Sequence, residues 1–380
     1  MNTVKKYLWC FYALFLLFLP VFSHASVVPE FQCKFPLKSP DVLFLVPADK
    51  PNLYWDRAIK AAKQASQQLD INLRVHYFDG TLNGIHIFPK ELDQLLSRID
   101  KPDYVVSFLW QKKEKKVIEI FKKHKVKLFT TDFTINDKLL ALVGNPRQEY
   151  QNWIGHLSAD DYQVGYDLMS FLIDQIHKKK GEKTTLLAMT GSHGNDASEE
   201  RLRGLSTKVE ESEDVQFLQY VHANWTAEHS ELLTEKLLKR YKTVDMIWSA
   251  SDIMTVGIVK ALNKSSLTPD NEVIVGSIDW SPEVISLIKE SKVTVSFGGH
   301  ILNTAYILAL ILDYHNGYDF EPALGTIIKT NLYPVSKKSI DILTEKNFSS
   351  LNFSLLSKCL SKGDAIEINS FIPTQLLNLN

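Results

Sequence analysis

The sequence has few cysteines, no excess of charge of either sign and only one long apolar run. Three cysteines in 380 residues are too few for a disulfide-stapled scaffold or a multi-cysteine zinc module. There are 43 lysines and arginines against 44 aspartates and glutamates, whereas binding to nucleic-acid phosphates needs a clear excess of basic residues. We therefore expect no nucleic-acid partner. The hydrophobic share of 45% is typical of globular chains, and the length favours two domains.

The motifs of common hydrolases and nucleotide-binding enzymes are also missing. The sequence contains no G-x-S-x-G, no H-E-x-x-H, no P-loop and no G-x-G-x-x-G after its first apolar strand-like run. The nearest candidate, residues 191–196, lies between an apolar run and a helical segment, where glycine and polar residues are expected to form a turn and a cap. The 11 histidines show no metal-ligand spacing. We expect no enzyme activity, no metal and no cofactor; a secreted hydrolase is the alternative of a different class.

The long apolar run lies at the N-terminus. Lys5 and Lys6 precede an uncharged apolar stretch from residue 7 to residue 22, and Ser23-His24-Ala25 supplies the small residues that signal peptidase requires. The stretch is shorter than the roughly 20 apolar residues that cross a bilayer. We expect residues 1–25 to be a secretion signal that is cleaved after Ala25, leaving a soluble, exported protein.

Two cysteines remain after this cleavage, Cys33 and Cys359. In an oxidising compartment they could form a disulfide that joins the two ends of the chain. Two unpaired structural thiols are the alternative, and neither cysteine is expected to be catalytic.

From residue 41 to about residue 335, short apolar runs alternate with segments of helical period. Strands separated by helix-length segments need crossover connections, which produce parallel sheets covered on both faces. The sequence therefore predicts two doubly wound α/β lobes with parallel sheets. The tail, residues 336–380, shows only one plausible helix, around residues 339–346. The expected strands are 41–48, 72–78, 104–109, 126–132, 184–190, 215–221, 246–251, 272–278 and 292–297.

Aromatic and charged residues follow the expected strands at their carboxyl ends, which is where open α/β sheets bind ligands. Flat aromatic faces can stack on the C–H faces of a sugar ring, and carboxylates and guanidinium groups bind hydroxyls at defined angles. This combination suits an uncharged ligand with several hydroxyls, although Asp252 could instead be a helix cap. The candidate ligand-binding residues are Tyr54, Trp55, Asp132, Arg201, Trp225, Ser251, Asp252, Asp279 and His300.

The order and the amino-acid sequences of these segments resemble those of the type I periplasmic sugar-binding proteins, which include the ribose- and galactose-binding proteins and the receptor for autoinducer-2. The similarity covers most of residues 41–335. It is carried by Tyr54-Trp55, TTD at 130–132, MTG at 189–191 with RLRG at 201–204, VDMIWSASDIMTVGIVKAL at 244–262, VIVGSIDW at 273–280, and SFGGHILNTAYILALILDYHNGYDF at 296–320.

The resemblance implies two lobes joined by a three-strand hinge that close over a ligand. The N-terminal lobe would comprise residues 41–154 and 300–322, and the C-terminal lobe residues 155–299 and 323–335. It further implies roles for six candidates. Tyr54 and Trp55 would stack on the ligand, Asp132 and Arg201 would bind hydroxyls, and Trp225 would be the second-lobe aromatic contact. Asp279 would be the hinge-side carboxylate.

Two positions depart from the family pattern. Sugar binders commonly have Asn-Asp where this chain has Ser251-Asp252, and commonly have arginine where it has Phe133. Both replacements remove hydrogen-bond donors, so the resemblance does not fix the ligand.

The resemblance implies a periplasmic solute-binding protein that delivers a small neutral carbohydrate to an inner-membrane ABC permease. The alternative is a ligand-sensing periplasmic receptor with the same fold, which signals through a membrane sensor kinase or cyclase, as the autoinducer-2 receptor does.

Overall fold

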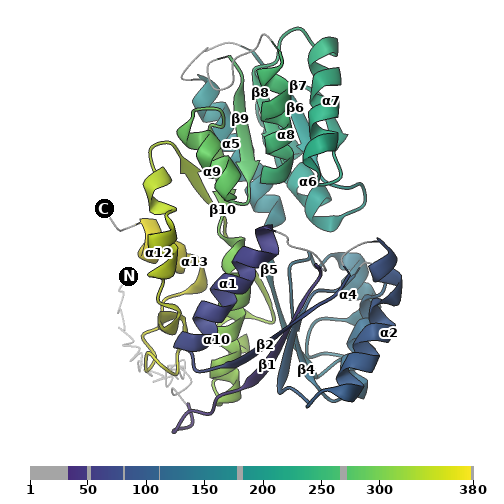
Figure 1. Ribbon diagram of the computed structural model, residues 1–380, viewed down its shortest axis with the longest axis vertical. Coiled ribbons are helices and arrows are strands. Elements are labelled where there is room, and N and C mark those ends of the chain that lie inside the picture. Colours follow the sequence, from purple (N-terminus) through teal and green to yellow (C-terminus); the bar gives the residue numbers. More distant parts are fainter. Residues whose placement is uncertain are drawn as a thin grey trace, which may run out of the picture.

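The computed structural model describes residues 33–48, 53–79, 82–110, 112–177, 183–265 and 272–377. The expected secretion signal, residues 1–25, lies outside the described residues. Figure 1 shows two α/β lobes placed one above the other along the long axis of the molecule. None of the helices in the described ranges has the length and apolar character that a membrane crossing requires.

The first lobe is built on a six-stranded sheet with the order β11-β5-β4-β3-β1-β2, and every neighbouring pair in it is parallel. Alternate residues of β1 face opposite sides, so that Phe44 packs with α1 (Leu53–Gln68) and α10 (Asn303–His315), while Leu45 packs with the helices of the other face. Those helices are α2 (Leu82–Arg98), α3 (Glu114–Lys123) and α4 (Asp137–Val143). The strands are β1 (Asp41–Val46), β2 (Asn72–Tyr77), β3 (Tyr104–Ser107), β4 (Lys127–Thr131), β5 (Trp153–Ala159) and β11 (Ile327–Thr330).

The second lobe repeats this plan with a six-stranded sheet of order β12-β10-β9-β8-β6-β7. Only β12 runs antiparallel to its neighbour, β10; the other described pairs are parallel. The fully buried Trp248 of β8 lies in the core, as its strand position predicts. The strands are β6 (Thr184–Thr190), β7 (Val215–His222), β8 (Met246–Ser249), β9 (Ile274–Ile278), β10 (Val295–Gly298) and β12 (Tyr333–Ser336). The helices are α5 (Asp161–His177), α6 (Asp196–Glu210), α7 (Ala227–Arg240), α8 (Asp252–Asn263) and α9 (Pro282–Lys289).

Within the described residues the chain passes between the lobes after β5, after β10 and between β11 and β12. The observed boundaries differ from the expected ones. The expected boundary at residue 154 falls inside β5, and β11 pairs with β5 in the first sheet although residues 323–335 were assigned to the second lobe. A parallel strand must run its full length before its carboxyl end reaches the other lobe, so the first and third crossings lie later in the chain than the motifs indicate, whereas the second, after β10, lies where it is expected.

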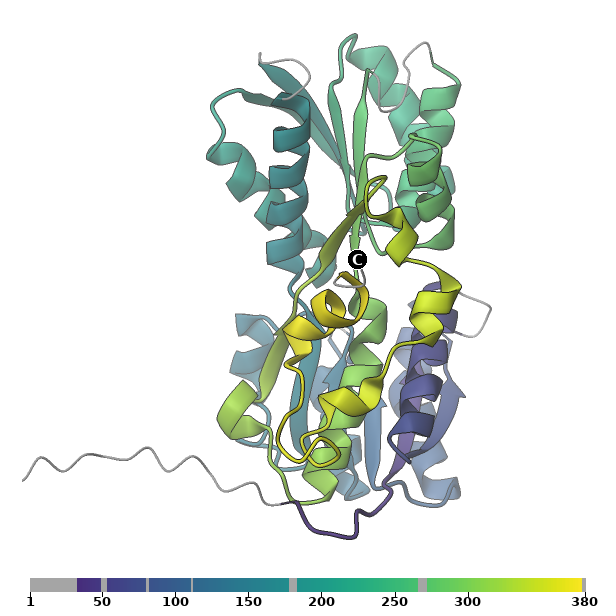
Figure 2. The same cartoon turned by 90° about the vertical axis from the view of Figure 1, so that its left-hand side faces the viewer.

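The C-terminal tail packs onto the first lobe instead of extending from it. Figure 2 shows this segment, in yellow, running from β12 along the side of the first lobe. Phe353, Phe371 and Ile372 are buried in the same apolar cluster as α1 and α10. The single helix expected around residues 339–346 is replaced by short helical turns, which are too brief to give a periodic pattern. They are η2 (Ile340–Ile342), α12 (Glu345–Ser349), η3 (Phe353–Leu356), α13 (Ile368–Ile372) and η4 (Pro373–Leu377).

Polar contacts fix the tail at two places. Asp313 at the end of α10 is buried, and its carboxylate accepts hydrogen bonds from the Ser357 hydroxyl at 2.5 Å and the Lys358 backbone N–H at 2.7 Å. Asn369 of α13 binds the third crossing, accepting from the Asn331 N–H at 2.9 Å and donating to the Lys329 carbonyl at 3.2 Å. The tail thus braces one of the segments that join the lobes.

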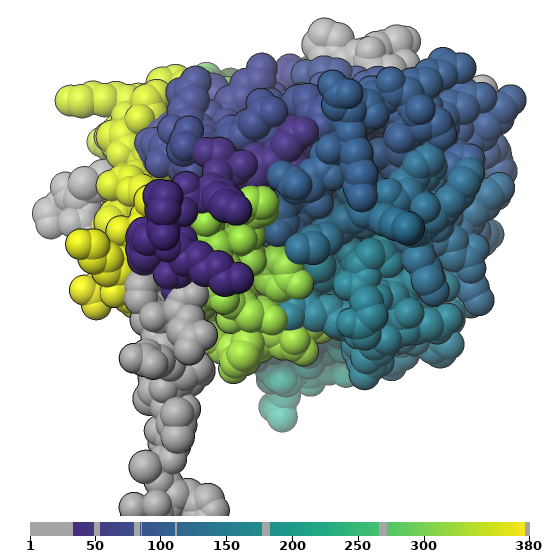
Figure 3. Space-filling model, turned by 90° about the horizontal axis from the view of Figure 1, so that it is seen from below, coloured from purple at the N-terminus to yellow at the C-terminus, as the bar shows by residue number. Residues whose placement is uncertain are grey.

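A disulfide joins Cys33 to Cys359 across 326 residues of sequence, with a Cα–Cα distance of 5.5 Å. Of the two states that the sequence leaves open for these cysteines, the structure has the pair. Figure 3 shows the first described residues, in dark purple, beside the yellow C-terminal tail at the base of the first lobe.

Replacing both Cys33 and Cys359 with serine should lower the free energy of unfolding by about 2–4 kcal/mol, because the cross-link limits the freedom of the unfolded chain. Urea unfolding under non-reducing conditions measures this difference. Wild-type protein unfolded with reductant is the control and should match the double variant. Equal midpoints for oxidised and reduced wild-type protein would show that the bond adds nothing.

Candidate ligand-binding site

The carboxyl ends of the two sheets border a cleft of about 790 Å³ between the lobes. All of the candidate residues named from the sequence line this cleft. The first lobe contributes three of them, the second lobe contributes five, and His300 follows the crossing after β10. They are Tyr54, Trp55 and Asp132 in the first group, and Arg201, Trp225, Ser251, Asp252 and Asp279 in the second.

The first-lobe wall is an aromatic cluster around one carboxyl group. The Tyr54 hydroxyl lies 3.1 Å from Asp132 Oδ1 and donates to it. The Tyr54 ring packs edge-on against Trp55, with centroids 5.1 Å apart, and stacks on His300 at 5.3 Å. Burial raises the pKa of Asp132 to about 6, against the opposing effects of His300 and the Tyr54 hydrogen bond. Asp132 therefore changes charge close to neutral pH.

Arg201 is the fixed cation of the second-lobe wall. Its side chain is buried, with Nε donating to Asp161 Oδ1 at 2.8 Å and Nη1 donating to the Ala250 carbonyl at 2.6 Å. The guanidinium group also lies 5.9 Å from the centroid of Trp225. Asp161 accepts a further hydrogen bond from the Thr134 hydroxyl of the first lobe at 2.8 Å. Arg201 is thereby held in one orientation at the mouth of the first crossing.

The position of Trp225 depends on a glycine. A Cβ atom on Gly191 would come within 2.0 Å of the Trp225 ring, so a side chain there would displace the indole. Trp225 itself has a φ of 57°, in the left-handed region that non-glycine residues seldom occupy. The MTG segment is therefore a packing surface for the second-lobe aromatic.

Asp252 lies at the wall, but protein groups occupy its carboxylate. Oδ1 accepts from the hydroxyls of Ser277 and Ser296, the latter at 2.9 Å, and Oδ2 accepts from the Ser281 N–H at 2.5 Å. Burial is the main cause that raises the pKa of Asp252, followed by the charge of Asp279. These contacts tie together the carboxyl ends of β9 and β10 and the start of α9. A direct contact between Asp252 and a ligand stays a prediction.

Three buried polar atoms at the cleft wall have no hydrogen-bond partner among the described residues: Ser251 Oγ, Trp110 Nε1 and His300 Nδ1. The other ring nitrogen of His300, Nε2, lies 3.3 Å from Asp279 Oδ1. Buried polar groups in folded proteins are nearly always hydrogen-bonded. These atoms are therefore candidates to bind polar groups of a ligand.

Sequence reasoning missed several lining residues. Trp110 follows β3, so the strand-end rule that found the others would also have found it. Asp161 was missed because β5 was not recognised as a strand. Arg57 and Glu283 lie on helices, and no local signal marks them.

Besides the hydrogen bond from Thr134 to Asp161, two further side-chain hydrogen bonds join the two borders of the cleft. Arg57 Nη1 of α1 donates to the Trp280 carbonyl in the second lobe. Asn136, the N-cap of α4, donates to Asp196 Oδ1 at the start of α6, at 2.9 Å. Two α/β lobes, three connecting segments and a polar-aromatic cleft between the lobes are the features of a two-lobe ligand-binding protein.

The chain belongs to the periplasmic binding protein family, because residues 42–317 match the model of the periplasmic binding protein domain. A periplasmic sugar-binding protein from Pseudomonas fluorescens shares the fold, with a TM-score of 0.77 at 23% identity over 89% of this chain and 100% of that chain. An ABC transporter periplasmic solute-binding protein from Actinobacillus succinogenes 130z, solved with bound D-allose, gives 0.69 at 19% identity over 80% and 99%.

A curated relative is the galactofuranose-binding protein YtfQ of Escherichia coli K12. It is 18% identical over 143 residues, which cover 37% of this chain and 44% of the relative, so the match spans less than half the length of that protein. The predicted fold class and the resemblance to type I periplasmic sugar-binding proteins are confirmed.

Replacing Arg201 with methionine should destabilise the protein by about 3–5 kcal/mol, because it leaves the buried Asp161 carboxylate without its cation. Urea unfolding measures the change. The matched control is Arg203→Met on the same helix, which breaks an exposed pair with Glu200 and should cost about 1 kcal/mol or less. The double variant Arg201→Met/Asp161→Asn should lose less unfolding free energy than the two single variants lose together. Strict additivity would contradict a direct Arg201–Asp161 interaction.

Proposed function

We propose that this protein is a periplasmic solute-binding protein that captures a small neutral carbohydrate in its interlobe cleft and delivers it to an ABC permease. One observation carries the proposal: aromatic side chains from both lobes line the cleft together with a few hydrogen-bonding side chains. Trp55 and Trp225 lie on its opposite walls, with Asp132 and Arg201 beside them. The relatives that bind galactofuranose and D-allose support the ligand class.

The proposed mechanism is closure without covalent chemistry. The ligand first binds one lobe, and the second lobe then adds contacts that exist only in the closed state, so the ligand shifts the population toward that state. The indole faces would cover the apolar sides of the ring. Asp132 would accept from ligand hydroxyls, whereas Trp110 Nε1 would donate to a ligand oxygen and Ser251 Oγ could do either.

The location follows from the family and the N-terminal segment. Periplasmic delivery requires export, so the mature chain would begin after Ala25. The disulfide between Cys33 and Cys359 suits the oxidising periplasm.

A thermal-shift screen of pyranoses, furanoses and polyols should identify a ligand that raises the melting temperature. Ligand at 100 times its dissociation constant stabilises the folded state by about 2.7 kcal/mol. Trp55→Ala and Trp225→Ala should each weaken binding by about 1–3 kcal/mol through lost stacking and burial. The matched control is Tyr220→Ala, which removes an exposed second-lobe aromatic outside the cleft. A shift with amino acids or nucleosides and none with carbohydrates would refute the proposed ligand class.

Ligand affinity should also depend on pH through Asp132. The carboxyl is ionised above its pKa of about 6 and accepts from ligand hydroxyls, whereas below that value it is protonated and loses this capacity in part. Affinity should fall between pH 7.5 and pH 5 by up to about tenfold, which is the limit for a single group that must be ionised. Calorimetric titration at several pH values measures this profile. Asp132→Asn should bind more weakly at pH 7.5 and lack the decline; a parallel decline in this variant would exclude Asp132 as its source.

A further inference from the structure

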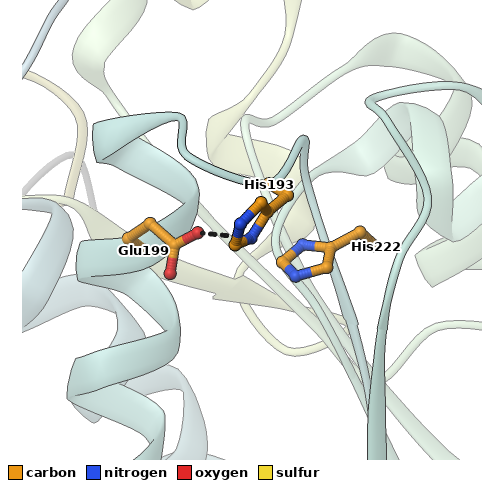
Figure 4. Close-up of side chains that lie close together, drawn as sticks. All are labelled: His193, Glu199 and His222. Atoms are coloured by element: carbon orange, nitrogen blue, oxygen red, sulfur yellow. Dashed lines mark ion pairs between the residues drawn. The ribbon is translucent and has the colours of Figure 1, made fainter.

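Three potential metal ligands from separate elements converge beside the cleft in the second lobe. His193 lies in the loop after β6, Glu199 in the first turn of α6, and His222 at the end of β7. Figure 4 shows the two imidazoles and the carboxylate close together. One ligand atom from each residue lies within 4.8 Å of the other two. Among the described residues no other group of three or more His, Cys, Asp or Glu side chains meets this criterion.

We propose that His193, Glu199 and His222 form a binding site for a divalent transition metal, with Zn²⁺ as the expected ion. Two imidazoles and one carboxylate are a ligand set that zinc uses at sites with a fourth, open position. Magnesium and calcium prefer sites made of oxygen ligands, so the two imidazoles disfavour them.

The geometry needs only a small adjustment to hold the ion. With Zn–N bonds of about 2.0–2.1 Å, tetrahedral ligands lie about 3.3 Å apart. His193 Nδ1 is already 3.5 Å from Glu199 Oε1. The two imidazole centroids are 5.2 Å apart, and the His193 side chain is 86% exposed, so it can rotate toward His222 without displacing packed groups.

The other two ligands are held in place by protein contacts. His222 Nδ1 lies 2.7 Å from the Thr190 hydroxyl and 3.3 Å from the Gly191 carbonyl, which leaves Nε2 as the ligand atom. Glu199 Oε1 accepts from the Gly194 N–H at 2.9 Å. Hydrogen bonds of this kind orient the ligands of metal sites and raise the affinity of the site for the metal.

Metal bound at this site would affect the loop of residues 191–195, which forms part of the cleft wall. Asn195 lines the cleft and caps α6, and Gly191 supports the ring of Trp225. His193 lies within this loop, whereas Glu199 belongs to α6 and His222 to β7. Bound zinc would link the loop to these two elements and would therefore restrict residues 191–195. It would thereby fix part of the second-lobe wall.

The test uses the mature, oxidised protein without a histidine tag, freed of metal by chelator and dialysis. Competition with a chromophoric zinc indicator should show one equivalent of saturable binding. His193→Ala and Glu199→Gln should each weaken zinc binding at least tenfold, and Co²⁺ in the wild-type protein should give the intense visible absorption of tetrahedral coordination.

The matched control is His124→Ala. His124 Nε2 also pairs with a carboxylate, that of Asp93 at 2.6 Å, but no third ligand in the described part of the chain belongs to this pair. This variant should bind zinc as the wild type does. Because His193 is exposed, its replacement leaves the fold intact, which circular dichroism can verify. Zinc affinity unchanged by His193→Ala, or no saturable binding at millimolar zinc, would overturn the proposal.

Discussion

Parallel strand pairing is the constraint on which this molecule depends. It places the carboxyl ends of neighbouring strands at one edge of each sheet, and the crossings after β5 and β10 leave from those edges. The two edges must therefore face each other, and the segments that follow the strands become the walls of one cleft. The short crossings also limit how far the lobes can separate. A binding site and a hinge thus arise from the same connectivity.

The cleft walls are held by backbone conformations that are costly on their own. Asp132, Trp225, Asp279 and Trp280 all have positive φ values, between 56° and 128°. Such positions persist only where surrounding contacts fix them. Trp280 illustrates this, because its side chain is fully buried and its Nε1 donates to the Ser296 carbonyl at 2.9 Å. Three of these residues, Asp132, Trp225 and Asp279, line the cleft, so the strained positions lie at strand ends that form its walls.

The regular parts of the fold could be predicted because their residues repeat. Apolar runs marked most strands, and the residues after them marked most of the cleft wall. The sequence does not mark β5 as a strand because Gly155, His156 and Ser158 interrupt its apolar pattern. All residues of β5 are nevertheless buried, because both faces of the sheet are covered. Arg57 of α1 donates to a carbonyl of the other lobe, that of Trp280. The Asp252 carboxylate bonds to Ser277 and Ser296, which lie 25 and 44 residues further along the chain. Such tertiary placements leave no periodic signal.

The structure of the tail could not be predicted for a related reason, because the tail is held by its contacts with the first lobe and not by a periodic pattern of its own. Ile372 and Phe353 add to a first-lobe cluster that also includes Trp280 and α9 of the second lobe. The apolar core is therefore continuous along the hinge side, and the disulfide closes the chain from Cys33 to Cys359 into a covalent ring that contains both lobes. A protease that cuts one loop anywhere within this ring releases no fragment, because the two pieces remain linked. Closure of the ring thus gives the protein tolerance to a single cut between residues 33 and 359.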